Sequence, residues 1–290
     1  MRVGYIGHFG AYHTEWGVAD ALEKYAQVDC YHFPNLDRQV YIARDYDLTL
    51  TTCPHMFGVE FWQSLGPKVA HYFDLIPGWK EREKLYFPAL KLFELVLSTD
   101  ANHPAYGEAG INARWLKQAY DPKDYYPVEA PVERDVGFVG HLYDRKRKRI
   151  AEVLSRRFTF EAFGSDGQCR GEEHARVCAS SRIMVADNAR NDLKGYWSNR
   201  AYLHLACGAF VLHPRVPGMS SYFKDKKHLV YYDGEDDLVA KVAYYLEHQG
   251  ERGRIAEAGR KLVARNHTWK ARVAELWRLL CESGLSPTRT

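Results

Sequence analysis

The sequence lacks several features that would place it in a specialised class of protein. No apolar run approaches the roughly 18 residues of a membrane-spanning helix, so we expect no membrane span. The opening residues, MRVGYIGHFG, already form a strand-and-turn pattern, so we expect no signal peptide. The six cysteines include no Cys-x-x-Cys pair and no cysteine–histidine spacing typical of zinc sites. We therefore predict no metal site, and reduced, mostly buried thiols in a cytoplasmic protein.

Charge of one sign is not in excess either. Lysine and arginine number 40 against 37 acidic residues, which gives a formal net charge of +3. This balance neither requires nor excludes a nucleic-acid partner. Tyrosine and tryptophan, in contrast, are plentiful at 20 and 7 copies, which favours stacking on bases or sugars.

The arrangement of apolar segments predicts two similar halves. Short apolar runs alternate with helical patterns in the first half, and the same rhythm restarts at residue 135. A proline-rich stretch, DPKDYYPVEAPVER, separates the halves. We predict an α/β protein with two facing Rossmann-like domains, each on a parallel sheet, and a cleft between them. The expected parts are a first domain at 1–125, a linker at 126–134, a second domain at 135–268, and a final helix and tail at 269–290.

A helix and a buried strand meet through small residues in YWSNRAYLHLACGAFVLHPRVPG, residues 196–218. Small residues there let the backbone approach a ligand closely, with Asn199 and Arg200 on the helix within reach of it. The same residues also suit a helix that packs tightly on a sheet, so both interpretations stay open.

The basic run GHLYDRKRKR, residues 140–149, follows a predicted strand and leads into a predicted helix. A helix N-terminus with added arginine or lysine favours a diphosphate group. A solvated basic face or a nucleic-acid patch is the alternative. The acidic run at 233–237 starts another predicted helix, and we interpret it as helix capping instead of a metal site.

Four segments of the second half carry a resemblance to a known family. They are FVGHLYDRKR, SNRAYLHLACGAFVLHPRVPGMSSYF, HLVYYDGEDDL and GERGRIAEAGRKLVARNHTW, and together they cover about residues 135–275. In these segments the chain resembles GT-B glycosyltransferases, and most of all their CgeB-like or group 1 members. KVAHYFDLIP and ELVLSTD extend the resemblance more weakly into the first half. The resemblance implies the GT-B fold, a last helix that crosses back to the first domain, and a bacterial or phage source.

The resemblance further implies that the second domain binds a nucleotide-diphosphate sugar as co-substrate, without a cofactor or metal. Many relatives carry a Glu-x7-Glu pair before the small-residue turn, but this chain has Leu203 there and no glutamate between 174 and 234. Retention or inversion of the sugar's configuration is therefore left open. The predicted donor-binding residues are Gly140, His141, Arg145, Lys146, Ser198, Asn199, Arg200, Gly208, Pro217, Gly218 and Met219.

The first domain would bind the acceptor. Asp74, at the end of a predicted strand, and His71 are the first candidates for the catalytic residues, with Asp74 as the base. The alternatives for the base are His8, His13, His55 and Asp100. Asp74 equally suits the turn before Pro77, and a lone histidine is commonly a packed side chain. The predicted acceptor-side residues are Gly7, His8, Gly10, His13 and Asp100.

These expectations favour a cytoplasmic glycosyltransferase that acts on a hydroxyl of a glycan, a protein or a hydroxymethylated DNA base. Two alternatives stay open. One is a nucleotide-sugar 2-epimerase of the same fold, which would need carboxylates beside the sugar. The other is a non-catalytic module that binds nucleotide sugars or glycans. The sequence does not determine the oligomeric state.

Overall fold

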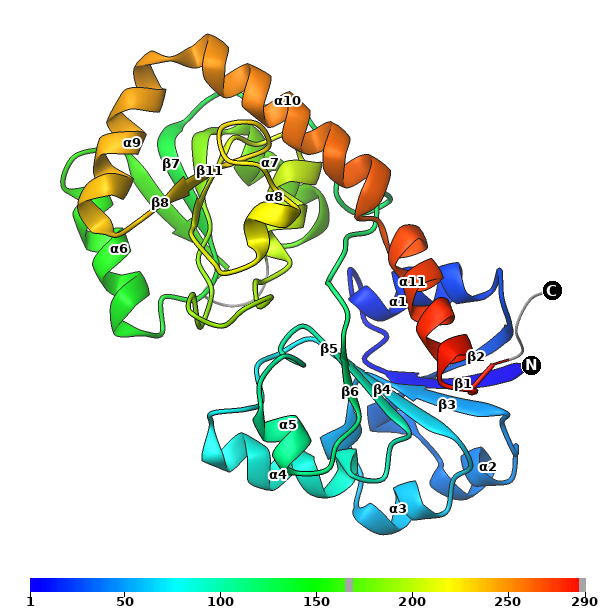
Figure 1. Cartoon of the computed structure of the whole chain (residues 1–290). Helices are drawn as coiled ribbons and strands as arrows, with labels where there is room; N and C mark the ends of the chain where they lie inside the picture. The colour runs from blue at the N-terminus through cyan, green and yellow to red at the C-terminus, as the bar shows by residue number, and fades with distance from the viewer. Residues whose placement is uncertain (165–168, 287–290) are drawn as a thin grey trace. The chain divides into compact units, whose positions relative to one another are not determined.

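The computed structural model describes residues 1–164 and 169–286 and divides the chain into two compact units (Figure 1). Unit 1 comprises Met1–Gln118 and Trp269–Thr290, and unit 2 comprises Ala119–Thr268. The division precedes the expected one at residue 125. The reason is that Tyr120 is buried in unit 2, where its N–H donates to the His267 carbonyl at 3.2 Å.

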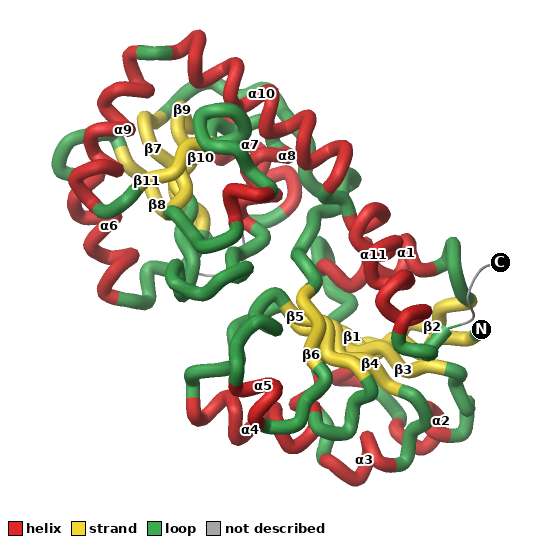
Figure 2. The backbone as a smooth tube through the Cα atoms, viewed as in Figure 1, coloured by secondary structure: helices red, strands yellow, loops and turns green. Residues whose placement is uncertain are grey.

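Unit 1 is built on a six-stranded parallel sheet with the strand order β2-β1-β3-β4-β5-β6, and helices cover both faces (Figure 2). The inner strands β3, β4 and β5 are buried along their whole length, as expected for a parallel sheet covered on both faces. The strands are β1 (Arg2–Gly7), β2 (Gln27–His32), β3 (Leu48–Thr51), β4 (Lys68–Tyr72), β5 (Leu95–Ser98) and β6 (Ala113–Trp115). The helices are α1 (Thr14–Leu22), α2 (Arg38–Ile42), α3 (Val59–Gln63), α4 (Lys80–Leu90), α5 (Ala105–Glu108) and α11 (Trp269–Glu282).

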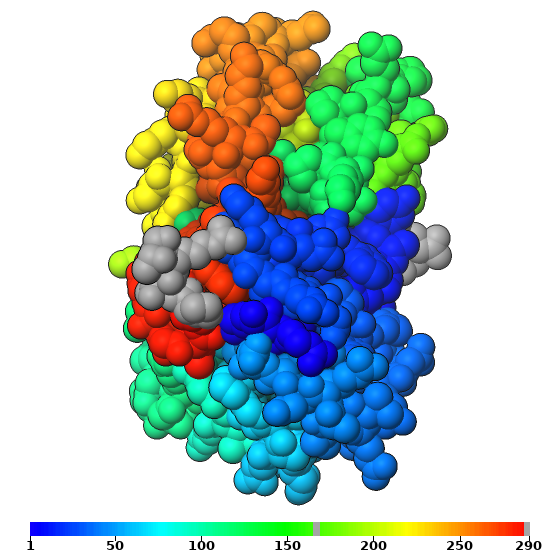
Figure 3. All heavy atoms as spheres, turned by 90° about the vertical axis from the view of Figure 1, so that its right-hand side faces the viewer, coloured from blue at the N-terminus to red at the C-terminus, as the bar shows by residue number. Residues whose placement is uncertain are grey.

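The last helix, α11, belongs to unit 1, as the expected crossing helix should. Trp269 opens the helix, is buried, and packs edge-on against Phe73 with ring centroids 5.6 Å apart. Further along, Trp277 stacks on Tyr25 at 5.1 Å. Figures 1 and 3 both show α11 beside the amino-terminal segment. The apolar face of α11 therefore completes the core on one side of the unit 1 sheet.

Unit 2 is built on a five-stranded parallel sheet with the order β11-β10-β9-β7-β8. Within the described ranges, no helix of the chain is both long and apolar enough to cross a membrane. The strands are β7 (Arg134–Val139), β8 (Phe160–Phe163), β9 (Ser181–Val185), β10 (Val211–Pro214) and β11 (Val230–Tyr232). The helices are α6 (Arg145–Ser155), α7 (Gly171–Ala179), α8 (Arg200–Ala206), α9 (Glu235–Glu247) and α10 (Gln249–Asn266).

Both sheets have the same type of switch point. In unit 1 the strand order reverses between β1 and β3, and in unit 2 it reverses between β7 and β9. The connections that leave these neighbouring strands run to opposite faces, so a crevice opens beyond their carboxyl ends. A ligand site is expected at these two positions before any side chain is considered.

Candidate donor site and acceptor-side cluster

A glycine and an arginine form the centre of the unit 2 switch point. Gly140 directly follows β7 and has a φ of +142°, a conformation that residues with a side chain rarely adopt. The guanidinium of Arg200, the first residue of α8, lies against this glycine. A Cβ atom on Gly140 would be only 3.1 Å from Arg200 Nε. Gly140 thus lets the guanidinium of Arg200 lie directly on the carboxyl end of β7.

A buried carboxylate gathers further cations at the end of β9. Asp187 is fully buried and lies 2.9 Å from Lys146 Nζ and 3.3 Å from Arg147 Nε. Its backbone carbonyl accepts a hydrogen bond from Arg200 Nη1 at 2.9 Å. We call Lys146, Arg147, Arg200 and Asp187 the cation cluster. It joins α6, α8 and the carboxyl end of β9.

The cation cluster carries more positive than negative charge. Its three cations face two carboxylates, Asp187 and the more distant Asp144, which lies 3.7 Å from Arg147 and caps α6. Burial, and next the neighbouring Arg147, lowers the pKa of Arg200 to about 10, so this guanidinium stays charged at neutral pH. The side chain of Lys146 is 41% exposed and can turn toward a ligand. Excess cations at the start of a helix suit an anion such as a diphosphate.

A pocket of about 390 Å³ adjoins the cation cluster and shares Lys146 and Asp187 with it. Asn191, Tyr232 and Asp233 also line it, so its wall combines an aromatic ring with acceptors for hydroxyl groups. Its size lies near the lower end of the range for small-molecule sites. The pocket therefore has the size and polarity expected for part of a nucleotide.

The acidic run at 233–237 pairs with neighbouring groups. Asp233 accepts from Arg215 Nε at 3.0 Å, and Glu235 accepts from Arg149 Nε at 3.0 Å. Asp237 accepts from the backbone N–H of Asp233 at 2.8 Å, at the start of α9. Two of these contacts are ion pairs with arginines, and no side chain of the described residues makes a capping hydrogen bond at the N-terminus of α9, so the capping interpretation stays a prediction.

Five of the predicted donor-binding residues come together around the cation cluster. The His141 carbonyl accepts from Arg147 Nη1 at 3.1 Å, and the Ser198 hydroxyl accepts from Arg200 Nη1 at 2.9 Å. Arg145 is exposed at the first position of α6, and Asn199 caps the start of α8. The five residues are Gly140, His141, Lys146, Ser198 and Arg200.

The other predicted donor-binding residues lie elsewhere in unit 2. Pro217, Gly218 and Met219 follow β10, and the Pro217 carbonyl accepts from the Gly195 N–H at 3.0 Å. Gly208 lies at the opposite edge of the sheet, because it precedes β10 whereas Gly140 follows the parallel strand β7. Its nearest neighbours are Pro127 and Arg260. The structure thus separates Gly208 from the cation cluster.

Asp187, Asn188 and the structural role of Arg147 were not predicted from the sequence. The side-chain oxygen of Asn188 accepts from the Ser198 N–H at 2.9 Å. The segment MVADN contained a usable signal, since two polar residues directly follow a buried strand of a parallel sheet. Burial of Arg147 beside Asp187 depends on how α6 packs, and the sequence gives no signal for that contact.

We expect Gly140→Ala to destabilise the protein and displace Arg200. The side chain would impose a strained φ and bring a methyl group to 3.1 Å from Arg200 Nε, at a cost of about 1 to 3 kcal/mol. Thermal unfolding measures this cost. Gly253→Ala is the control, because Gly253 lies in α10 with open space around it and should gain slightly in stability. Equal melting temperatures for Gly140→Ala and the wild type would contradict this account of Arg200.

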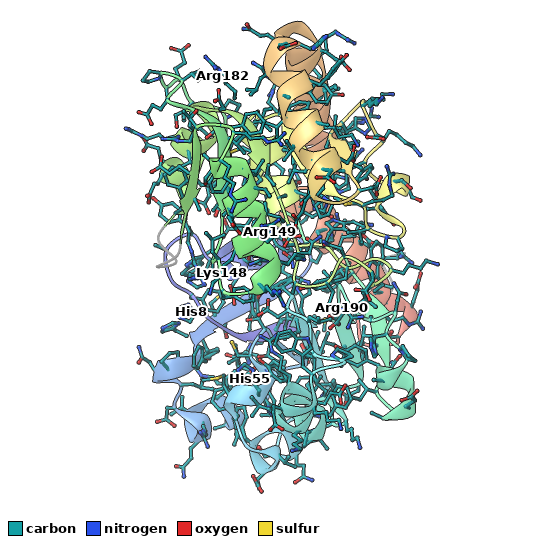
Figure 4. The ribbon with its side chains drawn as sticks, turned by 90° about the vertical axis from the view of Figure 1, so that its left-hand side faces the viewer. His8, His55, Lys148, Arg149, Arg182 and Arg190 are labelled. Atoms are coloured by element: carbon teal, nitrogen blue, oxygen red, sulfur yellow. The ribbon has the colours of Figure 1, made fainter. Side chains whose placement is uncertain are left out.

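Unit 1 has a cluster of histidines and a carboxylate at its own switch point. Glu15, near the start of α1, accepts from the Thr52 hydroxyl at 2.7 Å and from the His8 N–H at 3.2 Å. His13 Nδ1 lies 3.9 Å from Glu15, and the ring of His13 stacks on that of His8 at 4.1 Å. Figure 4 shows His8 together with His55, which belongs to the same unit. We call His8, His13, Glu15 and Thr52, which link the ends of β1 and β3, the acceptor-side cluster.

The glycines predicted on the acceptor side lie next to this cluster, Gly7 as the last residue of β1 and Gly10 in the loop that follows. A Cβ atom on Gly7 would be 2.7 Å from the Glu15 side chain, and one on Gly10 would be 2.9 Å from the His13 ring. The absence of side chains at these two positions therefore lets Glu15 and His13 lie close to the backbone.

Asp74, His71 and Asp100 have different environments. Asp74 is exposed just after β4, in a position open to a substrate. His71 is buried among Phe73 and Trp269, and burial, followed by repulsion from Arg272, lowers its pKa to about 3. Asp100 is also buried and accepts from Ile76 N–H and Tyr106 O–H, both at 2.8 Å. His71 and Asp100 therefore lie in the interior, His71 on the buried strand β4 and Asp100 in the turn after β5.

Three solved structures are similar to this chain in fold and distant from it in sequence. One is Anabaena Alr3699/HepE in complex with UDP and glucose, with a TM-score of 0.69 and 13% identity over 97% of this chain and 99% of that chain. Another is sucrose-phosphate synthase from Thermosynechococcus elongatus, with a TM-score of 0.67 and 13% identity over 97% and 98% of the two chains. The third is an alpha-glucosyltransferase in complex with UDP and a 13-mer DNA containing an HMU base. It has a TM-score of 0.73 and 8% identity over 97% and 99%.

The fold is therefore that of the GT-B glycosyltransferases. Residues 145–278 also match the sequence model of a family described as glycosyl transferase-like. No curated protein sequence matched the chain. The family match over residues 145–278 and the GT-B fold both support a glycosyltransferase. The CgeB-like subgroup stays a prediction.

Proposed function

We propose that the protein transfers a sugar from a nucleotide-diphosphate sugar to a hydroxyl acceptor, with the donor bound at the cation cluster of unit 2. The observation that carries this proposal is the excess positive charge of Lys146, Arg147 and Arg200 at the β7/β9 switch point. Two of the similar solved structures hold UDP, which makes a uridine nucleotide the first donor to test.

The cation cluster would stabilise the negative charge that develops on the departing diphosphate. Lys146 and Arg200 are held near the strand ends by Asp187, so little reorganisation is needed when the sugar leaves. Since these side chains supply the positive charge, we propose that transfer needs no divalent metal at the diphosphate. Equal rates with and without added Mg²⁺ or Mn²⁺ would support this part of the proposal, and strict dependence on either ion would contradict it.

The acceptor-side cluster would supply the catalytic base. A neutral imidazole accepts a hydroxyl proton well near neutral pH, and a carboxylate partner holds the ring in position. His13 has such a partner in Glu15, which is itself fixed by Thr52. Asp74, exposed at the end of β4, is the second candidate. The buried environment of His71 does not suit this role.

The alternatives can be separated by what happens to the donor. We would incubate the protein with UDP, GDP, dTDP, CDP and ADP sugars, each with and without candidate acceptors, and analyse the products by mass spectrometry. A glycosyltransferase yields nucleoside diphosphate and a glycosylated acceptor. A 2-epimerase changes the donor without an acceptor, and a binding module leaves the donor unchanged. Either of the last two results would overturn the proposal.

We favour a glycan or protein acceptor over DNA. Several arginines on the surface of unit 2 are already paired with carboxylates, including Arg149 with Glu235 at 3.0 Å and Arg190 with Asp192 (Figure 4). Each of these pairs is neutral, so together they add no net positive charge for a phosphate backbone, unlike the cation cluster. The similar structure with bound HMU-containing DNA makes a modified DNA base the competing candidate.

Salt dependence tests the choice of acceptor. A DNA acceptor bound through 6 to 10 phosphates loses about 10³- to 10⁵-fold in affinity between 50 and 200 mM salt. For a neutral glycan we expect KM for the acceptor to change less than about threefold over this range, because few ions are released. A steep rise in this KM would instead point to a nucleic acid.

A further inference from the structure

A cluster of metal-ligating side chains lies inside unit 2, outside the donor site. His174 and Cys178 occupy the same face of α7, four residues apart, and His204 faces them from α8. All three side chains are buried, with at most 3% of each exposed. Figure 1 shows α7 and α8 next to one another. The proposed transfer reaction uses none of these residues.

The spacing of the three ligand atoms suits a tetrahedral metal ion. All three lie within 4.8 Å of one another. His174 Nε2 is 3.0 Å from His204 Nδ1, and Cys178 Sγ is 3.6 Å from the same nitrogen. A tetrahedral zinc ion, with bonds of about 2.0 Å to nitrogen and about 2.3 Å to sulfur, separates its ligand atoms by roughly 3.3 to 3.6 Å. The side chains are therefore already close to the positions that zinc requires.

A backbone contact of His174 also favours ligation. The His174 ring hydrogen-bonds the backbone of Cys169, a contact typical of a metal-binding histidine.

A candidate fourth ligand and an access route lie beside the three side chains. The thiol of Cys207, three residues after His204, interacts with that of Cys178 but lies outside the group of three, so it would have to move closer to bind the same ion. Cys178 and Cys207 both line a groove of about 920 Å³ at the amino edge of the unit 2 sheet. We call this the amino-edge groove. A metal ion could reach the two thiols from the groove without passing the donor site.

We propose that His174, Cys178, His204 and Cys207 form a structural zinc site that fastens α7 to α8. Two imidazoles and two thiols in a tetrahedral arrangement are the ligand set that zinc prefers in closed structural sites. Binding would release the thiol protons to solvent as the zinc–sulfur bonds form. Because Arg200 lies one turn before His204 on α8, the ion would also hold the helix that carries this donor-site cation.

Metal analysis of the full-length, untagged protein tests the proposal. We expect about one zinc per chain by mass spectrometry after purification in zinc-supplemented buffer. Replacement of zinc by Co²⁺ should give the visible absorption and thiolate charge-transfer bands of a tetrahedral cobalt site. Removal of the metal should lower the melting temperature by about 5 °C or more, and added zinc should restore it.

Matched variants locate the site. Cys178→Ser should bind less than a tenth of the wild-type zinc, whereas Cys30→Ser, which changes an exposed thiol in unit 1, should bind the wild-type amount. The cobalt spectrum of the wild type tests the proposal independently if Cys178→Ser fails to fold. A metal-free protein with no cobalt bands would overturn the zinc site and leave the donor site unaffected, since sugar transfer is measured separately.

Discussion

Replacing Lys146 with alanine is expected to lower kcat/KM for the donor by about 10- to 100-fold. Lys146 Nζ lies 2.9 Å from Asp187, and its half-exposed side chain can donate to a diphosphate instead. A charge-assisted hydrogen bond contributes about 1.5 to 3 kcal/mol, and each 1.4 kcal/mol corresponds to about a factor of ten. Steady-state kinetics with saturating acceptor measures the loss.

The matched control for this variant is Lys148→Ala. Lys148 is exposed on the same helix but two positions further along, so it lies on a different face of the helix from Lys146. Both variants remove one positive charge, so they change long-range steering of the donor equally. If Lys148→Ala loses as much activity as Lys146→Ala, the effect is general electrostatics, and the proposed diphosphate contact is wrong.

The His13→Asn variant should lower kcat by about 10²- to 10³-fold, because a general base contributes on the order of 10² to 10⁴ in rate. His13 occupies the N-cap position of α1, where asparagine is favoured, so we expect the variant to fold. Donor affinity should stay within twofold of the wild type, because the proposed donor residues belong to unit 2. Single-turnover kinetics and a donor titration separate the two quantities.

His103→Asn serves as the control for this experiment. His103 lies after β5 in the same unit, where its ring accepts from the Ala105 N–H at 3.2 Å, and asparagine can supply a similar acceptor. Its kcat should stay within about twofold of the wild type. If His13→Asn keeps more than a third of wild-type kcat, the base is elsewhere, and Asp74→Asn becomes the variant expected to lose activity.

Much of the fold could be predicted because parallel sheets leave a clear pattern in the sequence. Inner strands such as LTLT (β3) and LVLS (β5) are buried on both faces, and their short runs free of charged residues, rich in leucine, valine and threonine, identify them. The domain boundary was harder to predict. The proline-rich stretch suggested a boundary at residue 125. In the structure Tyr120 and Tyr125 are buried, and residues 119–125 belong to unit 2. That packing depends on tertiary contacts, which composition does not reveal.

The site could be predicted only in part. The family resemblance predicted Gly140 and Lys146 as donor-binding residues. In the structure Gly140 lies against Arg200, and Arg200 and Lys146 both contact Asp187. The placement of Gly208 could have been corrected from the sequence, because a turn that precedes a parallel strand lies at its amino end, away from the ligand-binding edge.

The cluster of His174, Cys178 and His204 contains no Cys-x-x-Cys pair, the spacing by which zinc sites are usually recognised in a sequence. His174 and Cys178 are four residues apart, and His204 and Cys207 are three apart, so each pair shares a helix face. This helical spacing was a visible signal. What the sequence does not show is that α7 and α8 bring the two faces together.

Hydrogen–deuterium exchange with and without a bound nucleotide sugar tests the central claim most directly. If the cation cluster binds the diphosphate, exchange should slow by at least about tenfold at residues 140–147 and 187–200, the segments that carry Gly140, Lys146, Asp187 and Arg200. Amides around the amino-edge groove, at 127–131 and 249–260, should be unchanged. Protection confined to that groove, with none at 140–147, would contradict the account.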